Sequence, residues 1–244
     1  MTNQTCKAAV LTKKHTIEVM DVQMPECGRD GMIIKLEAAS ICGTDLHLFE
    51  EDPAYPVILG HELCGRVVEM GPDAAKSMRC YTGEVKLGDR ICLYPWVVCG
   101  TCENCLTYGI GACGVCDNSF VYGVPYESLG FGGAPIRSNS IYEAPYIKGG
   151  FGEYMYVFPG TFMWQVPDDM PSNVASLLDP MAVAMRGVEL AMRAPGIFED
   201  SFNLGSTALV IGDGQIAALV ATIARTLGIQ LSLIHISEPT RPLY

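Results

Sequence analysis

Short apolar runs of the kind that form β-strands occupy the first part of the chain. Six runs carry β-branched, apolar or aromatic residues and are separated by turn residues, which include Gly28, Gly71, Gly83 and Gly88. The runs are Lys7–Leu11, Thr16–Val22, Met32–Ala39, Cys64–Met70, Arg90–Tyr94 and Tyr154–Val157. Strands at this spacing predict a sandwich or a barrel.

The hydrophobic pattern becomes helical after Pro171. Apolar residues recur at three- and four-residue spacing between Val174 and Leu190, which is typical of a helix. The apolar run Ala208–Ile211 then predicts a strand of a parallel sheet, and the sequence up to Leu227 predicts a helix. We therefore expect a mixed α and β protein, with a β-rich domain over residues 1–170 and a second domain that begins over residues 171–230.

Composition and charge limit the partners of the chain. Of its 244 residues, 49% are hydrophobic and 18% are charged, as in an ordinary globular protein, and the formal net charge is −11. Nucleic acids and anionic membranes require clustered Lys and Arg, so both are excluded as main partners. The N-terminus carries no apolar signal core, which predicts a cytoplasmic protein.

The C-terminal segment does not read as natural protein. Residues 231–242 resemble, codon for codon, the translation of a transposase sequencing adaptor. We expect residues 231–244 to be a non-native tail and the natural chain to be cut near Gln230. His235 is therefore no ligand candidate.

Four cysteines form a first candidate metal site. Cys99, Cys102, Cys105 and Cys113 stand as C-x2-C-x2-C-x7-C in a Gly-rich lobe over residues 97–116, which has too few apolar residues for a core of its own. Thiolates at this spacing can converge on one tetrahedral zinc ion with no position left open. Cys116 is a further thiol that could compete with Cys113 for the fourth position.

Two other uses of the cysteines are less consistent with the sequence. A disulfide framework needs an oxidising compartment, and 11 cysteines is an odd number. The bacterial iron–sulfur run closes with x3 and a proline, whereas here the gap is x7 and Gly114 follows. Structural zinc is the favoured hypothesis, and the cysteines outside the lobe other than Cys42 are interpreted as core or reduced surface residues.

A second set of ligand types lies upstream, where Cys42 precedes the triplet Gly60-His61-Glu62. A cysteine, a histidine and a carboxylate spread along the chain can hold zinc and leave one position open for chemistry. A lone histidine is more often a satisfied core residue, but Cys42 and Glu62 favour a ligand role for His61.

A glycine-rich turn follows the predicted strand at residues 208–211. Gly212-x-Gly214-x-x-Ala217 fits the G-x-G-x-x-G/A pattern, in which a pyrophosphate lies against the N-terminus of the next helix. A turn without ligand is the alternative. The acid that binds the ribose is expected about 20 residues later. That position is close to His235 in the adaptor-like tail, so this residue is absent.

Taken together, the motifs resemble one family. Its pattern is matched in order by Cys42-Gly43-Thr44-Asp45-x-His47, by Gly60-His61-Glu62-x-x-Gly65-x5-Gly71-x-x-Ala74, by the four cysteines, by residues 150–154 and by the glycine-rich turn. The chain is similar, from about residue 7 to 228, to the zinc-dependent medium-chain alcohol dehydrogenases. This resemblance implies a GroES-like β-barrel domain at 1–170 with a zinc lobe at 97–116, then a Rossmann domain, truncated within 171–230, that binds NAD or NADP through Gly212, Gly214 and Ala217.

The resemblance also assigns ligands. Cys42 and His61 match ligands of the catalytic zinc, and a carboxylate supplies the third contact. Asp179 matches a position where relatives have Cys, Asp or Glu, whereas Glu62 matches a residue that some relatives use directly and others keep in reserve. We favour Asp179, with a structural acid in a helical turn as the alternative reading. Asp45 matches a group that orients the histidine ligand.

The implied activity is hydride transfer between an alcohol or polyol and NAD or NADP, in a full-length enzyme with one catalytic and one structural zinc. The resemblance implies that Thr44 contacts the substrate alcohol, that Thr44 and His47 pass its proton to solvent, and that the enzyme is a homo-oligomer. We expect the chain as given to be inactive. Apolar residues of the second domain should be partly exposed or covered by the tail, namely Leu209, Val210, Ile211 and Ile216.

Two alternatives belong to other classes. A metal-free reductase of the same superfamily would need neither Cys42 nor His61. A non-catalytic zinc-binding protein could keep the cysteine lobe alone. The number of zinc ions per chain distinguishes the last case, because an enzyme should hold two and a scaffold one.

Overall fold

The computed structural model describes residues 4–125, 138–193 and 206–234. The chain divides into two compact units, Met1–Leu177 and Leu178–Tyr244. The sequence analysis placed this division at residue 170. The adaptor-like residues 235–244, His235 among them, lie outside the described residues.

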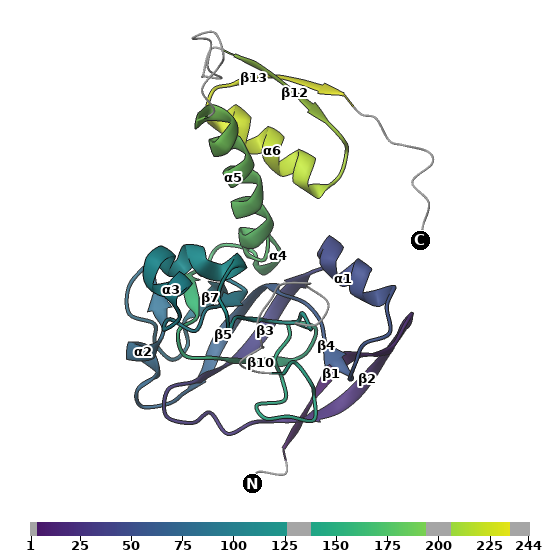
Figure 1. The fold of residues 1–244 in the computed structure, drawn as a ribbon, viewed down its shortest axis with the longest axis vertical. Helices are drawn as coiled ribbons and strands as arrows, with labels where there is room; N and C mark the ends of the chain where they lie inside the picture. The colour runs from purple at the N-terminus through teal and green to yellow at the C-terminus, as the bar shows by residue number, and fades with distance from the viewer. Residues whose placement is uncertain (1–3, 126–137, 194–205, 235–244) are drawn as a thin grey trace. The chain divides into compact units, whose positions relative to one another are not determined.

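The first unit consists mainly of strands (Figure 1). Its strands are β1 (Thr5–Lys13), β2 (Thr16–Gln23), β3 (Met32–Ser40), β4 (Val57–Ile58), β5 (Glu62–Met70), β6 (Arg79–Cys80), β7 (Arg90–Leu93), β8 (Trp96–Val97), β9 (Phe120–Val121), β10 (Tyr154–Val157) and β11 (Phe162–Gln165). Its helices are α1 (Gly43–Phe49), α2 (Ala74–Ser77), α3 (Glu103–Tyr108), the 3₁₀ helix η1 (Gly109–Gly114) and α4 (Ser172–Ala175).

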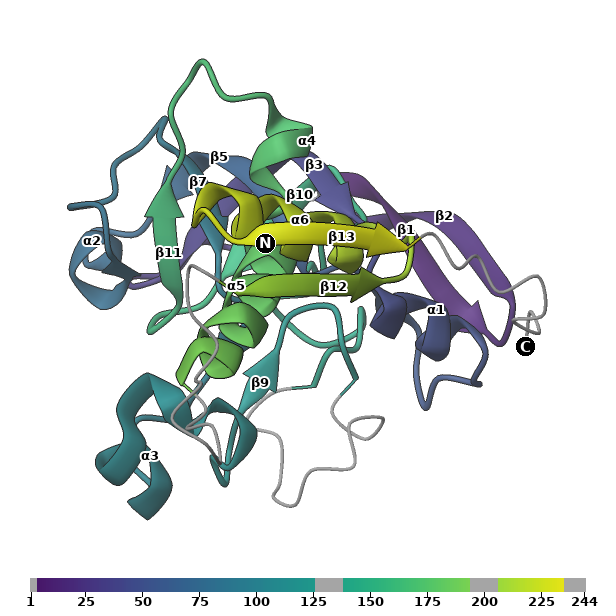
Figure 2. The ribbon, with the colours of Figure 1, turned by 90° about the horizontal axis from the view of Figure 1, so that it is seen from above.

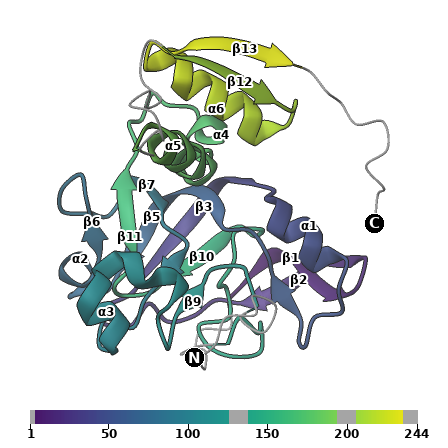
Figure 3. The ribbon, with the colours of Figure 1, turned by 45° about the horizontal axis from the view of Figure 1, so that its top comes forward.

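The strands form one long sheet and smaller ones. The six-stranded sheet has the order β10-β3-β5-β7-β11-β6, and the three-stranded sheet has the order β2-β1-β4. Figure 3 shows β11, β7, β5 and β3 following one another across the larger sheet. The long pairing of β3 with β5 sets Ser40 opposite Glu62. His61, the residue before β5, therefore lies where this pairing ends.

Residues 150–154 join the two larger sheets. Gly152 bridges to Ala8 of β1, and the Glu153 carboxylate accepts a hydrogen bond from the Lys7 backbone N–H at 2.7 Å. On the other side, the Leu36 N–H of β3 donates to the Glu153 carbonyl at 2.9 Å. This segment therefore closes the strands into a barrel-like unit.

Burial follows the alternation of the strands. Along β1, Cys6, Ala8 and Val10 are buried while the residues between them are more exposed, as expected when one face of a strand lies on a core. A large cluster fills the unit, and a smaller one lies beside α1. The smaller cluster contains Leu11, Leu48, Val57, Leu59, Val121 and Val124.

The second unit contains α5 (Leu178–Arg193), β12 (Thr207–Ile211), α6 (Gln215–Thr226) and β13 (Gln230–Ile234). β12 and β13 are parallel neighbours, as Figure 2 shows, and α6 connects them. α5 has 16 residues, and no helix in the described part of the chain is long and apolar enough to cross a membrane. The mixed α and β class is confirmed.

Exposure of the second unit agrees with the prediction. Leu209 is 52% exposed, Ile211 64% and Ile216 46%, and Val210 is half-buried. β13 runs from Gln230 into the adaptor-like residues and pairs with β12 along its length.

The helical stretch predicted between Val174 and Leu190 is divided into α4 and α5. Pro180 has no backbone N–H, so it cannot donate to the Ser176 carbonyl and α4 cannot continue through it. Pro180 instead lies in the first turn of α5, where a missing N–H costs nothing.

Candidate metal centres and nucleotide-binding turn

Three ligand-type side chains meet beside the start of α1. Cys42 caps this helix, His61 precedes β5, and Glu62 is the first residue of β5. The Cys42 sulfur, a His61 ring nitrogen and a Glu62 carboxylate oxygen all lie within 4.8 Å of one another. His61 and Glu62 are buried and Cys42 is half-buried. A soft thiolate, an imidazole and a carboxylate in this arrangement fit the donor set of a zinc site with an open position.

Asp45 fastens the two segments that carry these ligands. Its carboxylate accepts the backbone N–H of Cys42 at 2.8 Å and that of Gly60 at 3.1 Å. The distance from its Oδ1 to His61 Nδ1 is 3.9 Å, too long for a direct hydrogen bond. Burial raises the pKa of Asp45, although the neighbouring His61 and both N–H donors act in the opposite direction. Asp45 therefore positions the backbone on which the ligands stand.

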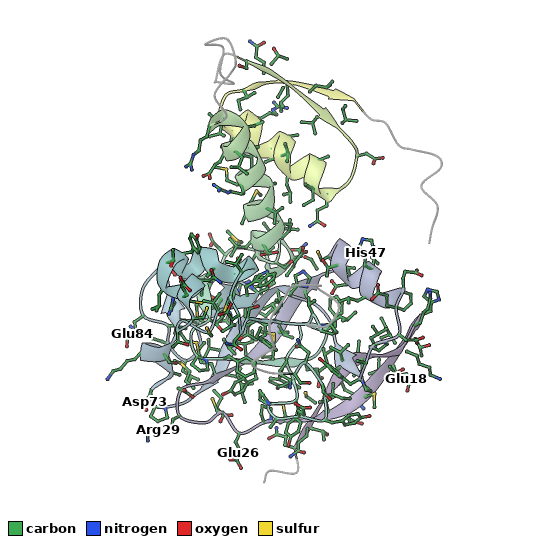
Figure 4. All side chains as sticks on the ribbon, in the orientation of Figure 1. Glu18, Glu26, Arg29, His47, Asp73 and Glu84 are labelled. Carbon is green, nitrogen blue, oxygen red and sulfur yellow. The ribbon has the colours of Figure 1, made fainter. Side chains whose placement is uncertain are left out.

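The two residues predicted to carry the proton differ in exposure. Thr44 is half-buried, and the Cys42 thiol donates to its hydroxyl oxygen at 3.7 Å. His47 lies on the exposed side of α1 (Figure 4). Thr44 thus borders the ligand group and His47 borders solvent, an order that suits proton transfer outward.

The two candidate carboxylates belong to different units. Glu62 lies with Cys42 and His61 inside the first unit. Asp179 is the second residue of α5 in the second unit and is half-buried. The structure therefore brings Glu62 to the other two ligands, and the role of Asp179 stays a prediction.

The cysteine lobe gathers four sulfurs, but they are not the predicted four. Cys99, Cys102, Cys105 and Cys116 have sulfurs that all lie within 4.8 Å of one another. Three separations are 3.8 Å for Cys99 to Cys105, 3.4 Å for Cys105 to Cys116 and 4.0 Å for Cys102 to Cys116. Zinc–thiolate bonds of about 2.3 Å at tetrahedral angles put sulfurs about 3.8 Å apart. The cluster fits a closed zinc site.

Cys113, the predicted fourth ligand, points elsewhere. Its sulfur accepts a hydrogen bond from the Tyr94 hydroxyl at 3.0 Å. The 3₁₀ helix η1 carries Cys113 past the cluster, and the chain returns at Val115, whose carbonyl accepts the Asn104 side-chain amide at 2.7 Å. Cys116, and not Cys113, lies with the other three sulfurs in this structure, and the choice of fourth ligand stays a prediction. The only sign of this in the sequence is that Cys116 lies three residues after Cys113.

Backbone N–H groups surround the sulfurs of the lobe. The Cys102 N–H donates to Cys99 at 3.4 Å, the Cys105 N–H to Cys102 at 3.4 Å, and the Cys99 N–H to Cys116 at 3.3 Å. Burial raises the pKa of Cys99, but the N–H donors of Thr101 and Cys102 outweigh it and lower the pKa to about 6. Burial raises the pKa of Cys105 and that of Cys116, so the thiolate that zinc binds is favoured at Cys99 and disfavoured at those two sulfurs.

The predicted nucleotide turn joins β12 to α6. Gly212 has a φ of +130°, and a Cβ there would lie 3.6 Å from the Ala217 Cβ, so strand and helix approach closely. Gly214 is the N-cap of α6 and is exposed, which leaves the first N–H groups of the helix accessible. Gly212, Gly214 and Ala217 thus take the positions that a pyrophosphate site requires.

Comparison with known proteins adds independent observations. Residues 28–168 match the family described as alcohol dehydrogenase GroES-like domain. L-threonine 3-dehydrogenase from Francisella tularensis subsp. mediasiatica (strain FSC147) is 31% identical over 217 residues, which cover 86% of this chain and 49% of that protein. The chain spans about half the length of the curated relatives it matches.

Solved structures resemble the whole described fold. A candidate zinc-binding dehydrogenase from Sinorhizobium meliloti 1021, bound to NADP, shares 30% identity and a TM-score of 0.67 over 95% of this chain and 56% of its own. Galactitol-1-phosphate dehydrogenase from Escherichia coli shares 24% identity and a TM-score of 0.69 over 95% of this chain and 56% of its own, a likeness of fold alone.

Proposed function

Because the chain belongs to the alcohol dehydrogenase GroES-like domain family, we propose that it is part of a zinc-dependent oxidoreductase. The proposed reaction transfers a hydride between an alcohol or polyol and NAD or NADP. One observation carries this proposal: Cys42 is distant in sequence from the neighbours His61 and Glu62, and yet the donor atoms of all three lie within 4.8 Å of one another. A structural role alone would not require such an open, mixed donor set.

Cys42 and His61 would hold the catalytic zinc, with Glu62 as the third ligand. Glu62 is preferred because it lies with the other two in one unit, and Asp179, which the sequence favoured, is the alternative. Bound zinc would act as a Lewis acid and lower the pKa of a substrate hydroxyl. Thr44 would accept the hydroxyl proton and His47, exposed on α1, would release it to solvent. The second zinc would be structural and bound by Cys99, Cys102, Cys105 and Cys116.

The dinucleotide would be held at the turn of Gly212, Gly214 and Ala217, with its pyrophosphate at the N-terminus of α6. Support comes from the close approach of Gly212 to Ala217 and from the S. meliloti relative, which was solved with NADP. The cofactor itself supplies the hydride acceptor.

Substrate, location and assembly are also proposals. The curated relative named above acts on L-threonine according to its name, which supports a small molecule that carries a hydroxyl group as the proposed substrate class. Because 11 cysteines is an odd number and five of them lie in the two candidate metal groups, we also propose a cytoplasmic location. We propose a homo-oligomer for the full-length protein and no activity for the 244-residue chain alone.

The test is an assay of the full-length protein with each dinucleotide. Purified protein is offered L-threonine, sugar alcohols, their phosphates and simple alcohols, with NAD⁺ or NADP⁺, and reduced cofactor is followed by absorbance. We expect turnover with one of these classes that is lost after zinc removal and restored by added zinc. Turnover that survives complete zinc removal would contradict the proposal.

A further inference from the structure

Residues 150–154 carry part of the family pattern but none of the proposed chemistry. Phe151 within this segment packs against the two larger hydrophobic clusters described for the first unit. Its N–H donates to the Leu59 carbonyl at 2.9 Å and its carbonyl accepts the Ala9 N–H at 2.8 Å. The backbone of Phe151 is therefore held between Ala9 and Leu59, and its ring packs in the core near the peptide that leads into His61.

Gly60 has the backbone conformation that the ring requires. Its φ is +89°, a region that other residues rarely adopt. A Cβ at this position would lie 2.6 Å from Phe151 Cδ1 and 2.7 Å from Cε1, closer than real contacts permit. The ring thus occupies the space that any side chain at residue 60 would need.

Both polar groups of Gly60 are also held. Its N–H donates to Asp45 at 3.1 Å, and its carbonyl accepts the Gly150 N–H at 2.8 Å. Gly123, with a φ of +65°, lies so close to the Gly60 carbonyl that it has no room for a Cβ. Gly60 is therefore held at its N–H and its carbonyl, the Phe151 ring fills the space beside its Cα, and the next residue is His61.

We infer that Phe151 is a positioning residue for the Cys42, His61 and Glu62 site. The ring holds Gly60 in its left-handed conformation, and this conformation directs the backbone so that His61 and Glu62 meet Cys42. This inference rests on the proposed function. Loss of an outer contact that orients a metal ligand typically weakens metal binding about 10–100-fold, and Phe151 acts through the backbone in the same way.

Cobalt(II) is the probe, because the mixed site and the four-sulfur cluster give it different absorption spectra. Each site is titrated in the 244-residue chain. Phe151→Ala is expected to weaken cobalt binding at the mixed site about 10–100-fold and to change its spectrum, while the four-sulfur spectrum and affinity stay as in the wild type. Gly60→Ala places a Cβ where the Phe151 ring lies, and it is also expected to weaken cobalt binding at the mixed site.

Matched variants separate positioning from folding. Phe151→Tyr retains the ring and should retain the mixed-site spectrum. Phe162→Ala removes another buried ring, on β11, and should leave cobalt binding at both sites unchanged. Phe151→Leu keeps much of the apolar volume, so it serves if the alanine variant does not fold, and thermal unfolding is recorded for each protein.

Three results would overturn the inference. The first is unchanged mixed-site affinity and spectrum in both Phe151→Ala and Phe151→Leu, with wild type binding cobalt at both sites. The second is parallel loss of both cobalt sites with early unfolding in Phe151→Leu, which would leave Phe151 a structural role only. The third is a wild-type chain that binds cobalt at the cysteine cluster alone, and only this result also contradicts the proposed function.

Discussion

The cysteine cluster and the Cys42, His61 and Glu62 site draw their ligands from very different stretches of chain. All four sulfurs of the cluster come from residues 99–116, and the hydrogen bonds around them are made by neighbouring N–H groups of the same segment. The second site joins residue 42 to residues 61 and 62. Gly60, which precedes His61, is contacted by Gly123, Gly150 and Phe151 from later parts of the chain.

The two sites also differ in the amount of hydrophobic packing around them. The small hydrophobic cluster of the lobe has the buried residues Cys105, Ala112 and Cys116, and two of these belong to the four-sulfur group. The second site lies on a unit with a large hydrophobic core and extended sheets. We propose that a metal would organise the polypeptide of the lobe, whereas the polypeptide of the barrel organises the ligand side chains of the other site.

The largest expected effect is on catalysis. In the full-length protein, His61→Ala should lower kcat/KM at least about 1000-fold, because Lewis-acid assistance is worth several kcal/mol and each 1.4 kcal/mol is about tenfold. The metal-free variant should unfold thermally close to the metal-free wild type, since the barrel does not depend on this metal. Steady-state kinetics and circular dichroism measure the two quantities. Full activity in the variant would show that the catalytic-site reading is wrong.

Metal affinity of the lobe should separate the two candidate fourth ligands. Cys116→Ser should weaken zinc binding at the lobe more than about 100-fold, beyond the cost of an outer contact, and should expose the amides of residues 97–116 to hydrogen exchange. Cys113→Ser should leave the zinc affinity of the lobe and its hydrogen-exchange protection unchanged. Cys102→Ser is the positive control, because it loses zinc under either assignment. Zinc loss in Cys113→Ser with retention in Cys116→Ser would reverse the assignment.

A smaller effect should decide the third catalytic ligand. Glu62→Gln is expected to weaken cobalt binding at the mixed site about 10–100-fold, in the range of an orienting or ligating contact. Asp179→Asn, the matched amide substitution in α5, should leave it unchanged. The opposite ranking in the full-length protein would assign the third contact to Asp179.

The smallest expected effect is on the stability of the barrel, through an ion pair that belongs to neither candidate metal site. Arg90 is 4% exposed and donates to Glu37 at 2.9 Å and to Ser172 at 2.8 Å. Glu37→Gln should lower the free energy of unfolding by about 1–2 kcal/mol, the range of a charge-assisted hydrogen bond that is partly exposed. Both metal affinities should stay the same.

The pH dependence of this pair has a defined sign. Burial raises the pKa of Glu37, but Ser172 and Arg90 outweigh it, so the folded-state pKa lies below its ordinary value. The stabilisation is therefore present above the unfolded pKa of about 4.3. It is lost as the pH falls through the lower folded-state pKa. Urea unfolding at neutral and acidic pH measures it, and a difference between wild type and Glu37→Gln that grows on acidification would contradict this account.

Local patterns predicted much of the fold. Short β-type runs bounded by turn residues identified β1 and β3, and the turn at Gly212 identified the start of α6, because strand-forming residues and tight turns leave local traces in the sequence. The two-residue strands β4, β6, β8 and β9 were not predicted. Runs so short have no period, and their pairing is decided by partners distant in the chain.

The site was predicted in part for similar reasons. Residue types and order singled out Cys42, His61 and Glu62, but spacing alone could not choose between Cys113 and Cys116, since that choice depends on how η1 turns the chain. The role inferred for Phe151 was also hidden, because it arises from contact with Gly60 across the barrel.

Metal content tests the central claim most directly. Zinc bound per chain is counted by elemental analysis after purification in zinc-containing buffer and dialysis. We predict two zinc ions in the wild-type chain, one in His61→Ala and one in Cys116→Ser, with the lobe losing its hydrogen-exchange protection only in the second variant. One zinc ion in the wild-type chain, unchanged by His61→Ala, would contradict the account and leave a protein with a structural zinc alone.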